Sequence, residues 1–281
     1  FSFSNNIIYN KFYIKPFDKK MKDLVWLYFS MKKLNVIEGY NLYSKFYKQE
    51  YKHLDSFDWE KVLIILKDIL LIKKNNERYK QNTVDVINRE SNIYSTNSTN
   101  ESNDIINIMI FGCADGRESF RIKKLCDRLN IKSEIFGVDI SENMIKEIKK
   151  KAKKENLKID NFFLYDFLKP FPKKFENFFD IIIGLFILVH IKENEIKILF
   201  ENVFNLLKVN SYFLFNNIPQ KEGKVLEVNN HKFLIEFYHH EKDDILKNIS
   251  YFNFELIKEL SIFENNKKIS DIYLLKKLEN N

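Results

Sequence analysis

The sequence has only two cysteines, Cys113 and Cys126, among its 281 residues. So few cysteines exclude a disulfide framework and a metal site built from Cys-x-x-Cys pairs. They favour a reducing compartment, and we expect a cytoplasmic protein.

Long hydrophobic runs are also missing. The longest strongly apolar run covers the nine residues 181–189, whereas a helix that spans a bilayer requires about twenty. Residues 1–20 mix aromatic residues, Asn and Lys, without the continuous apolar stretch of a signal peptide. The sequence therefore predicts no membrane span.

Charge of one sign is in small excess. Lys and Arg number 46 against 39 Asp and Glu, a formal net charge of +7, and charged residues make up 30% of the chain. This balance indicates a mixed surface rather than a basic arm, so binding to nucleic acid is permitted but not required. Hydrophobic residues make up 45% of the chain, which is enough to bury a core.

A segment rich in Asn, Ser and Thr, without apolar periodicity, divides the chain. We expect a disordered linker at 74–104 that separates an N-terminal helical region or cap (1–73) from a C-terminal domain (105–281). Apolar residues in the first region recur at three- and four-residue spacing, which predicts helices. The predicted helices cover residues 22–34, 37–51 and 59–72.

Downstream of the linker, short apolar segments alternate with amphipathic ones. This α/β alternation predicts a mostly parallel sheet that is covered by helices on both faces and binds ligands at the carboxyl ends of its strands. The predicted strands are 105–111, 134–139, 162–164, 179–185 and 212–215, and the predicted helices are 117–129, 142–154 and 193–207.

The C-terminal part departs from this alternation. Because only a short loop joins the last two predicted strands, they must run antiparallel. The predicted elements are a hairpin of strands 224–228 and 232–238, inserted at about 223–240, a helix at 243–249, and strands at 254–259 and 271–277.

Three small residues, Gly112, Ala114 and Gly116, lie between a predicted strand and a predicted helix. Small residues there let the backbone approach a ligand, and the start of the helix offers unpaired N–H groups. Asp139 ends the next strand, 23 positions after Gly116. At about this spacing a carboxylate meets the ribose hydroxyls of a bound nucleoside, so the pattern favours a cofactor that contains adenosine.

An ordered series of motifs strengthens this interpretation. FGCADG and FGVDISENM are followed by FLYDF, FDIIIGLFILVHIKENE, NLLKVNSYFLFNN and FNFELIKEL. Together they cover about residues 105–278. In this order they resemble the class I S-adenosylmethionine-dependent methyltransferases.

The resemblance implies S-adenosyl-L-methionine as cofactor and methyl transfer to an N, O or S atom of an acceptor. It also implies a Rossmann-like, doubly wound sheet of seven strands, mostly parallel with an antiparallel last strand, beneath an N-terminal helical cap. The residues that it assigns to the cofactor are Gly112, Cys113, Ala114, Asp115, Gly116, Asp139, Ile140, Asp166 and Phe167.

Two positions depart from the family pattern. Ile110 stands where the family usually has an acid, and Ala114 replaces the middle glycine. The missing acid removes a partner for the loop and for the methionine end of the cofactor. A catalytically inactive, methyltransferase-like binding or scaffold protein is therefore an alternative. The usual turn glycine before the fifth strand is replaced more mildly, by Asn210, which can adopt a positive φ.

His190 falls at the carboxyl end of the predicted fourth strand, beside the expected methyl acceptor. It is the candidate catalytic residue, able to orient the acceptor or take its proton. His239 and His240 follow the hairpin, in a region that often borders the acceptor pocket in this family. Adjacent strand residues point to opposite faces, and no metal-ligand motif accompanies them, so we expect no metal site.

Further features have plainer explanations. Cys113 is expected to be a small buried residue rather than a nucleophile, because no partner pattern accompanies it. Tyr43, Tyr47 and Tyr51 share one helical face, which indicates packing on the catalytic domain or closure over the acceptor. The Lys run at 149–154 predicts a solvated helix face.

The acceptor stays open at this stage. We favour a small molecule, with RNA and protein as alternatives. An NAD(P)-dependent oxidoreductase is a further alternative, since the glycine turn and acid would also fit a dinucleotide. Tyr273 and Lys277 have Tyr-x-x-x-Lys spacing, but they lie on a predicted strand, where the two would not line one helical face.

Overall fold

The computed structural model describes residues 32–44, 59–90, 105–219, 224–228, 231–235 and 237–279. Its centre is a seven-stranded sheet in the order β4-β3-β2-β5-β6-β10-β9. Strand β10 runs antiparallel to both of its neighbours, and the other paired strands are parallel. The predicted fold is thus confirmed. The strands are β2 (Ile106–Phe111), β3 (Ser133–Asp139), β4 (Phe162–Leu164), β5 (Phe179–Gly184), β6 (Leu207–Asn217), β9 (Phe254–Glu264) and β10 (Lys267–Lys277).

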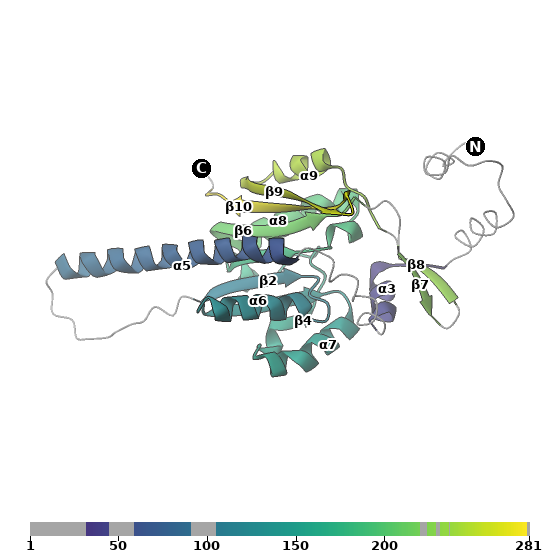
Figure 1. Cartoon of the computed structure of the whole chain (residues 1–281), viewed down its shortest axis with the longest axis horizontal. Coiled ribbons are helices and arrows are strands. Elements are labelled where there is room, and N and C mark those ends of the chain that lie inside the picture. The colour runs from purple at the N-terminus through teal and green to yellow at the C-terminus, as the bar shows by residue number, and fades with distance from the viewer. Residues whose placement is uncertain are drawn as a thin grey trace.

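Helices cover both faces of this sheet (Figure 1). Strand β2 shows why, because Ile108 and Ile110 belong to one apolar cluster while Met109 and Phe111 belong to the other. The first cluster contains residues of α5 (Trp59–Glu90), α6 (Arg117–Arg128) and α7 (Glu142–Ala152), and the second contains residues of α8 (Ile196–Leu206) and α9 (Lys242–Ile249).

Helix α5 belongs to this core although it precedes the sheet by a long segment. Its residues Val62, Ile65, Leu66, Ile69 and Leu70 recur at three- and four-residue spacing and are at most 3% exposed. Figure 1 shows the C-terminal half of the helix extending beyond the sheet. The N-terminal half of α5 is therefore an integral layer of the domain.

A buried ion cluster secures α5 to the sheet. Lys73 Nζ lies 3.6 Å from Asp180 Oδ1 and donates a 2.7 Å hydrogen bond to Ser211 Oγ. Asp180 Oδ2 also accepts hydrogen bonds from the Asn107 N–H, at 3.0 Å, and from Lys208 Nζ, at 2.8 Å. The carboxylate thus joins the helix to strands β2 and β6 from its place on β5.

A second, small sheet lies at one end of the molecule, beside α3 (Val36–Tyr43) (Figure 1). Strand β1 (Lys32–Leu34) pairs in parallel with β8 (His231–Ile235), which pairs antiparallel with β7 (Lys224–Val228). The predicted hairpin is confirmed, and its partner comes from the N-terminal region. We call α3 and this sheet the cap.

The cap is fixed to the start of α7. Asn41 Oδ1 accepts a 2.7 Å hydrogen bond from Ser141 Oγ, and the Asn41 carbonyl accepts one of 2.9 Å from Asn143 Nδ2. Since α7 begins just after β3, this contact places α3 at the carboxyl ends of the parallel strands.

Three sequence expectations differ from the structure. Residues 32–34 form a strand rather than the end of a helix, because the edge of β8 offers them hydrogen-bonding partners. Residues 74–90 are helical rather than linker, since no Gly or Pro interrupts α5. The loop expected between the last two strands is only a tight turn at Asn265-Asn266, where both residues have positive φ.

The other expected segments of the N-terminal half lie outside the described residues. These are the helix at 22–31, residues 45–51 of the second helix and the linker residues 91–104. Among the helices that are described, none combines the length and the apolar character that a membrane span requires.

Replacing Asp180 tests the ion cluster. We expect Asp180→Ala to lower the free energy of unfolding by about 3–5 kcal/mol, because Lys73 would stay buried without its carboxylate. Urea denaturation followed by circular dichroism measures this. Asp127→Ala is the matched control, since it removes an exposed ion pair with Lys123 and should change stability by less than about 1 kcal/mol. Equal effects of the two variants would contradict a structural role for the cluster.

Candidate functional site

A pocket of about 190 Å³ opens at the carboxyl ends of the parallel strands. Its walls come from the turns that follow β2, β3, β4 and β5, from cap helix α3 and from Trp59 at the start of α5. Ligands bind at this edge in open α/β sheets. The predicted site residues found in its lining are Gly112, Ala114, Asp139, Ile140, Asp166, Phe167 and His190.

The turn after β2 has the left-handed backbone that its small residues suggest. The φ angles are 66° at Gly112, 46° at Ala114 and 89° at Gly116. A Cβ atom at Gly116 would lie 2.6 Å from the Ile148 side chain, so packing against α7 requires glycine there. Ala114 keeps the same turn as a glycine would, at a cost in backbone strain.

Three predicted cofactor residues are outside the pocket lining. Cys113 is fully buried beneath the turn, as its plainer explanation predicted. Gly116 begins α6 and packs against α7. The Asp115 side chain is 2.5 Å from Lys151 Nζ, so that lysine of the 149–154 run holds the turn instead of facing solvent alone. The sequence pattern could not reveal this, because the pairing depends on how α7 packs on the turn.

Asp139 lies at the end of β3, 7% exposed and facing the turn after β2. Its Oδ2 accepts a 2.9 Å hydrogen bond from the Ala114 N–H, and its Oδ1 accepts one of 2.8 Å from the Ser141 N–H. Burial nevertheless raises the pKa of this carboxyl to about 6. Each oxygen has a second lone pair, so Asp139 can accept further hydrogen bonds from a ligand in the pocket.

The next wall of the pocket combines an acid with an aromatic ring. Asp166 Oδ1 accepts a 3.0 Å hydrogen bond from the Leu168 N–H, which fixes the turn after β4. The Phe167 ring is stacked on Phe111, with centroids 5.2 Å apart and planes within 7° of parallel. Phe167 and Ile140 thus give the pocket lining two apolar side chains close in sequence to the Asp166 carboxylate.

His190 ends the single turn of 3-10 helix Leu188–His190, after β5. Its Nε2 lies 2.8 Å from the Tyr40 hydroxyl, and the two rings meet edge to face with centroids 5.1 Å apart. Phe237 packs against the His190 ring at 5.2 Å. Burial lowers the pKa of the imidazole to about 4, so the ring is neutral at physiological pH.

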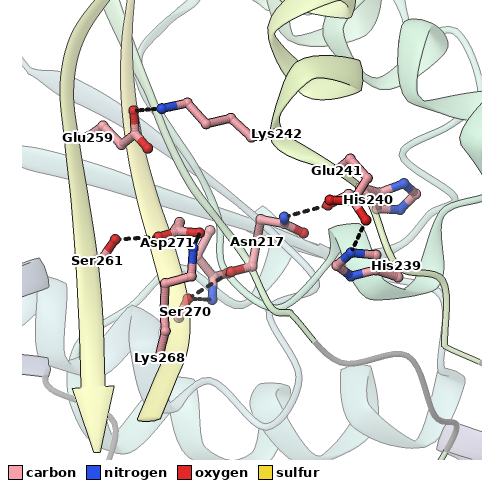
Figure 2. A network of polar contacts seen from close by, with 11 residues as sticks. Asn217, His239, His240, Glu241, Lys242, Glu259, Ser261, Lys268, Ser270 and Asp271 are labelled. Atoms are coloured by element: carbon pink, nitrogen blue, oxygen red, sulfur yellow. Dashed lines mark hydrogen bonds and ion pairs between the residues drawn. The ribbon is translucent and has the colours of Figure 1, made fainter. Parts of the chain in front are cut away.

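His239 and His240 have structural contacts. His240 Nε2 lies 2.9 Å from the Leu188 carbonyl, and the His240 carbonyl accepts a hydrogen bond from Asn217 Nδ2. His239 faces Glu241. Figure 2 shows the contacts of His239 with Glu241 and of the His240 carbonyl with Asn217, which lies near Ser270 of β10. Neither histidine lines the pocket, and no three His, Cys, Asp or Glu side chains of the described residues group as a metal site would require.

Tyr273 and Lys277 do not form a catalytic pair. Tyr273 is fully buried in the sheet core. Lys277 Nζ donates hydrogen bonds to the Phe204 and Leu207 carbonyls and to Asn177 Oδ1. The two residues with the spacing that would suit an oxidoreductase thus have structural roles.

The pocket includes residues that sequence reasoning missed. Tyr40 lies one turn before Tyr43, the first residue of the predicted tyrosine stripe, but the register of α3 brings Tyr40 to the site. The Tyr43 side chain, Tyr47 and Tyr51 lie outside the described residues. Phe186 has a φ of 60°, unusual for a bulky residue, and its N–H donates to Asn216 Oδ1. Such strain is common at functional sites.

The departure at Ile110 also has a structural counterpart. Ile110 is 2% exposed within the first apolar cluster. An acid does line the pocket nearby, because Glu118 reaches it from the first turn of α6. Nothing in the sequence pattern singled out this residue.

Comparison with known proteins agrees with this architecture. A family model described as a methyltransferase domain matches residues 102–255. No curated protein matches the sequence.

Solved structures match this chain at low sequence identity. An S-adenosylmethionine-dependent methyltransferase from Methanosarcina mazei has 14% identity and a TM-score of 0.50, over 63% of this chain and 94% of that chain. The CMeT domain of the citrinin polyketide synthase has 16% identity and a TM-score of 0.51, over 64% and 48%. Magnesium protoporphyrin IX methyltransferase from Synechocystis PCC 6803, solved with bound S-adenosylmethionine, has 17% identity and a TM-score of 0.46, over 72% and 79%.

Replacing Ala114 by glycine tests the strain in the turn. We expect Ala114→Gly to raise the free energy of unfolding by about 0.5–1 kcal/mol, because glycine adopts the left-handed φ without steric cost. Ala152→Gly is the control, since Ala152 has a helical φ of −53°. Glycine there should lower the free energy of unfolding by about 1 kcal/mol. Denaturant titration measures both. A loss of stability in Ala114→Gly would show that the turn carries no such strain.

Proposed function

The chain belongs to the class I S-adenosylmethionine-dependent methyltransferases, and on that basis we propose that it methylates a small, largely apolar molecule enclosed beneath its cap. The contact between Tyr40 and His190 carries this proposal, because it joins the cap to the turn after β5 and covers the pocket. Methyl transfer from S-adenosylmethionine is the activity of the family, and the acceptor is the new assignment.

The pocket offers acceptors for two polar parts of the cofactor, the ribose hydroxyls and the adenine amino group. Asp139 has unused lone pairs for the ribose hydroxyls, and burial raises the pKa of this carboxyl although backbone N–H donors act against the shift. Asp166 is placed to accept from the adenine amino group, while Ile140 and Phe167 flank the base. The backbone of Gly112 and Ala114 lets the rest of the cofactor approach the turn closely.

The acceptor side has a different character. Tyr40, Phe186 and Ile187 supply aromatic and apolar walls there, and His190 is neutral. Among the described residues that line the pocket, Arg117 is the only Lys or Arg. A nucleic-acid acceptor would call for several cations around its phosphates. The lining therefore supports a small acceptor over RNA, and the cap supports it over a protein side chain.

When bound, S-adenosylmethionine supplies an activated methyl group on its sulfonium. That methyl group would pass to an N, O or S atom of an acceptor held in the pocket, and S-adenosylhomocysteine would be the second product. The residues of the pocket hold the two reactants in line and keep water out. His190 and Tyr40 orient the acceptor.

The proton of the acceptor has a path through the same pair. Tyr40 can take it as its own hydroxyl proton passes to His190 Nε2, 2.8 Å away. Because burial lowers the pKa of His190, the pair is a weak base at neutral pH. An acceptor that carries an acidic proton, or that has none to lose, suits it best.

Binding of S-adenosylhomocysteine measured by calorimetry tests the cofactor assignment. Transfer of labelled methyl groups from S-adenosylmethionine into small-molecule, protein and RNA fractions of a cell extract tests the acceptor class. We expect label in the small-molecule fraction. Label confined to RNA or protein would overturn the proposed acceptor and leave the methyltransferase activity intact.

The pH dependence of binding tests Asp139. We use 5′-methylthioadenosine, which has the ribose but lacks the amino-acid arm. The ribose hydroxyls bind the ionised carboxylate, so affinity should be constant well above pH 6 and fall by about tenfold per pH unit below it. Asp139→Asn should bind more weakly at neutral pH and show a flat profile. A flat profile in the wild type would rule out this role.

Variants of the Tyr40–His190 pair test the acceptor side. With the acceptor identified by label transfer, we expect His190→Ala and Tyr40→Phe each to lower kcat by about 10- to 100-fold, with little change in the affinity for S-adenosylhomocysteine. Because both variants remove the same hydrogen bond, between Tyr40 and His190, the double variant should be little slower than either single variant. Multiplicative losses, or full turnover in His190→Ala, would leave this histidine with only a packing role.

A further inference from the structure

Glu118 is a carboxylate in the pocket to which the proposed function assigns no role. It lies in the first turn of α6, directly after the glycine turn, and its side chain is partly buried in the pocket wall. Among the described residues, no other side chain forms a hydrogen bond or an ion pair with it. Its contact is with its own backbone N–H.

The surroundings of this carboxylate favour the arrival of a cation. Burial raises the pKa of Glu118 to about 7, and Asp115 raises it further. The backbone hydrogen bond and the charges of Arg117 and Arg121 lower the pKa, but each effect is smaller than that of burial. A ligand with a positive charge and hydrogen-bond donors would offset the free-energy cost of burying the ionised carboxylate.

Resting on the proposed function, we infer that Glu118 binds the α-ammonium group of S-adenosylmethionine. The cofactor carries two cationic groups, and only the ammonium can donate hydrogen bonds to a carboxylate. The sulfonium carries the methyl group, the ribose carbon and the amino-acid arm. With the ribose at Asp139 and the methyl group toward His190, the arm is left to cross the Gly112–Ala114 turn toward the start of α6.

The other acids of the pocket are on the wrong side for this task. Asp139 ends β3 and Asp166 follows β4, on the ribose and adenine side of the proposed site. Ile110, within β2, has no charge to offer. Among the described residues of the lining, Glu118 is thus the acid next to the amino-acid arm.

A comparison of two ligands separates this role from a structural one. S-adenosylhomocysteine carries the amino-acid arm, and 5′-methylthioadenosine does not. We expect Glu118→Gln to weaken binding of S-adenosylhomocysteine by about 10- to 100-fold and to leave binding of 5′-methylthioadenosine nearly unchanged, as measured by calorimetry. Retained binding of the second ligand also shows that the variant is folded.

Two variants provide matched controls. Glu142→Gln makes the same change in the first turn of α7, where the side chain is exposed and pairs with Lys146, and it should affect neither ligand. Asp139→Asn should weaken the binding of both ligands, because both carry the ribose. This contrast identifies which end of the cofactor each acid binds.

Several results would overturn the inference. Equal losses for the two ligands in Glu118→Gln would indicate a distorted turn rather than a lost contact. Unchanged affinity for S-adenosylhomocysteine with a higher KM for the acceptor would assign Glu118 to the acceptor instead. If the wild type bound neither ligand, the proposed function itself would fail. If the wild type bound S-adenosylhomocysteine tightly and Glu118→Gln bound it equally well, only the inference about Glu118 would fail.

Discussion

The carboxylate of Asp139 is the constraint on which the pocket depends. One of its oxygens holds the Ala114 N–H of the turn after β2, and the other holds the Ser141 N–H at the start of α7. Ser141 Oγ in turn donates to Asn41 of the cap. A single line of hydrogen bonds therefore runs from the turn after β2 through Asp139 to the cap, so a change at Asp139 reaches both sides of the pocket.

The cap is assembled from two distant parts of the chain, and this explains how it can cover a site in the middle of the sheet. Strand β1 pairs with β8 of the hairpin, and α3 follows directly from β1. The return from the hairpin is fixed where the Tyr238 N–H donates to the Val189 carbonyl. His190 is consequently enclosed by Tyr40 from one part of the chain and by Phe237 from the other.

The sequence predicted those features that local pattern determines. Strands such as β2 alternate between two apolar faces, the spacing from Gly116 to Asp139 places an acid at the next strand end, and Asn210 has the positive φ expected of its turn. What it missed depends on contacts between distant residues. Strand β1 exists because β8 pairs with it, and the role of Lys151 depends on the packing of α7. No local signal distinguishes these residues from other members of a Lys- and Asn-rich chain.

The charges of the pocket also bear on its relative affinity for cationic and neutral ligands. Asp139, Asp166 and Glu118 line the pocket together with one cation, Arg117, among the described lining residues, whereas His190 is neutral. Acids gathered where water is scarce favour a cationic ligand over a neutral one of the same shape, because their interaction with charge is poorly screened. The sulfonium loses its charge when the methyl group leaves. The same three carboxylates would therefore hold S-adenosylmethionine more firmly than S-adenosylhomocysteine, and the turnover that consumes the charge would weaken the hold of the pocket on the product.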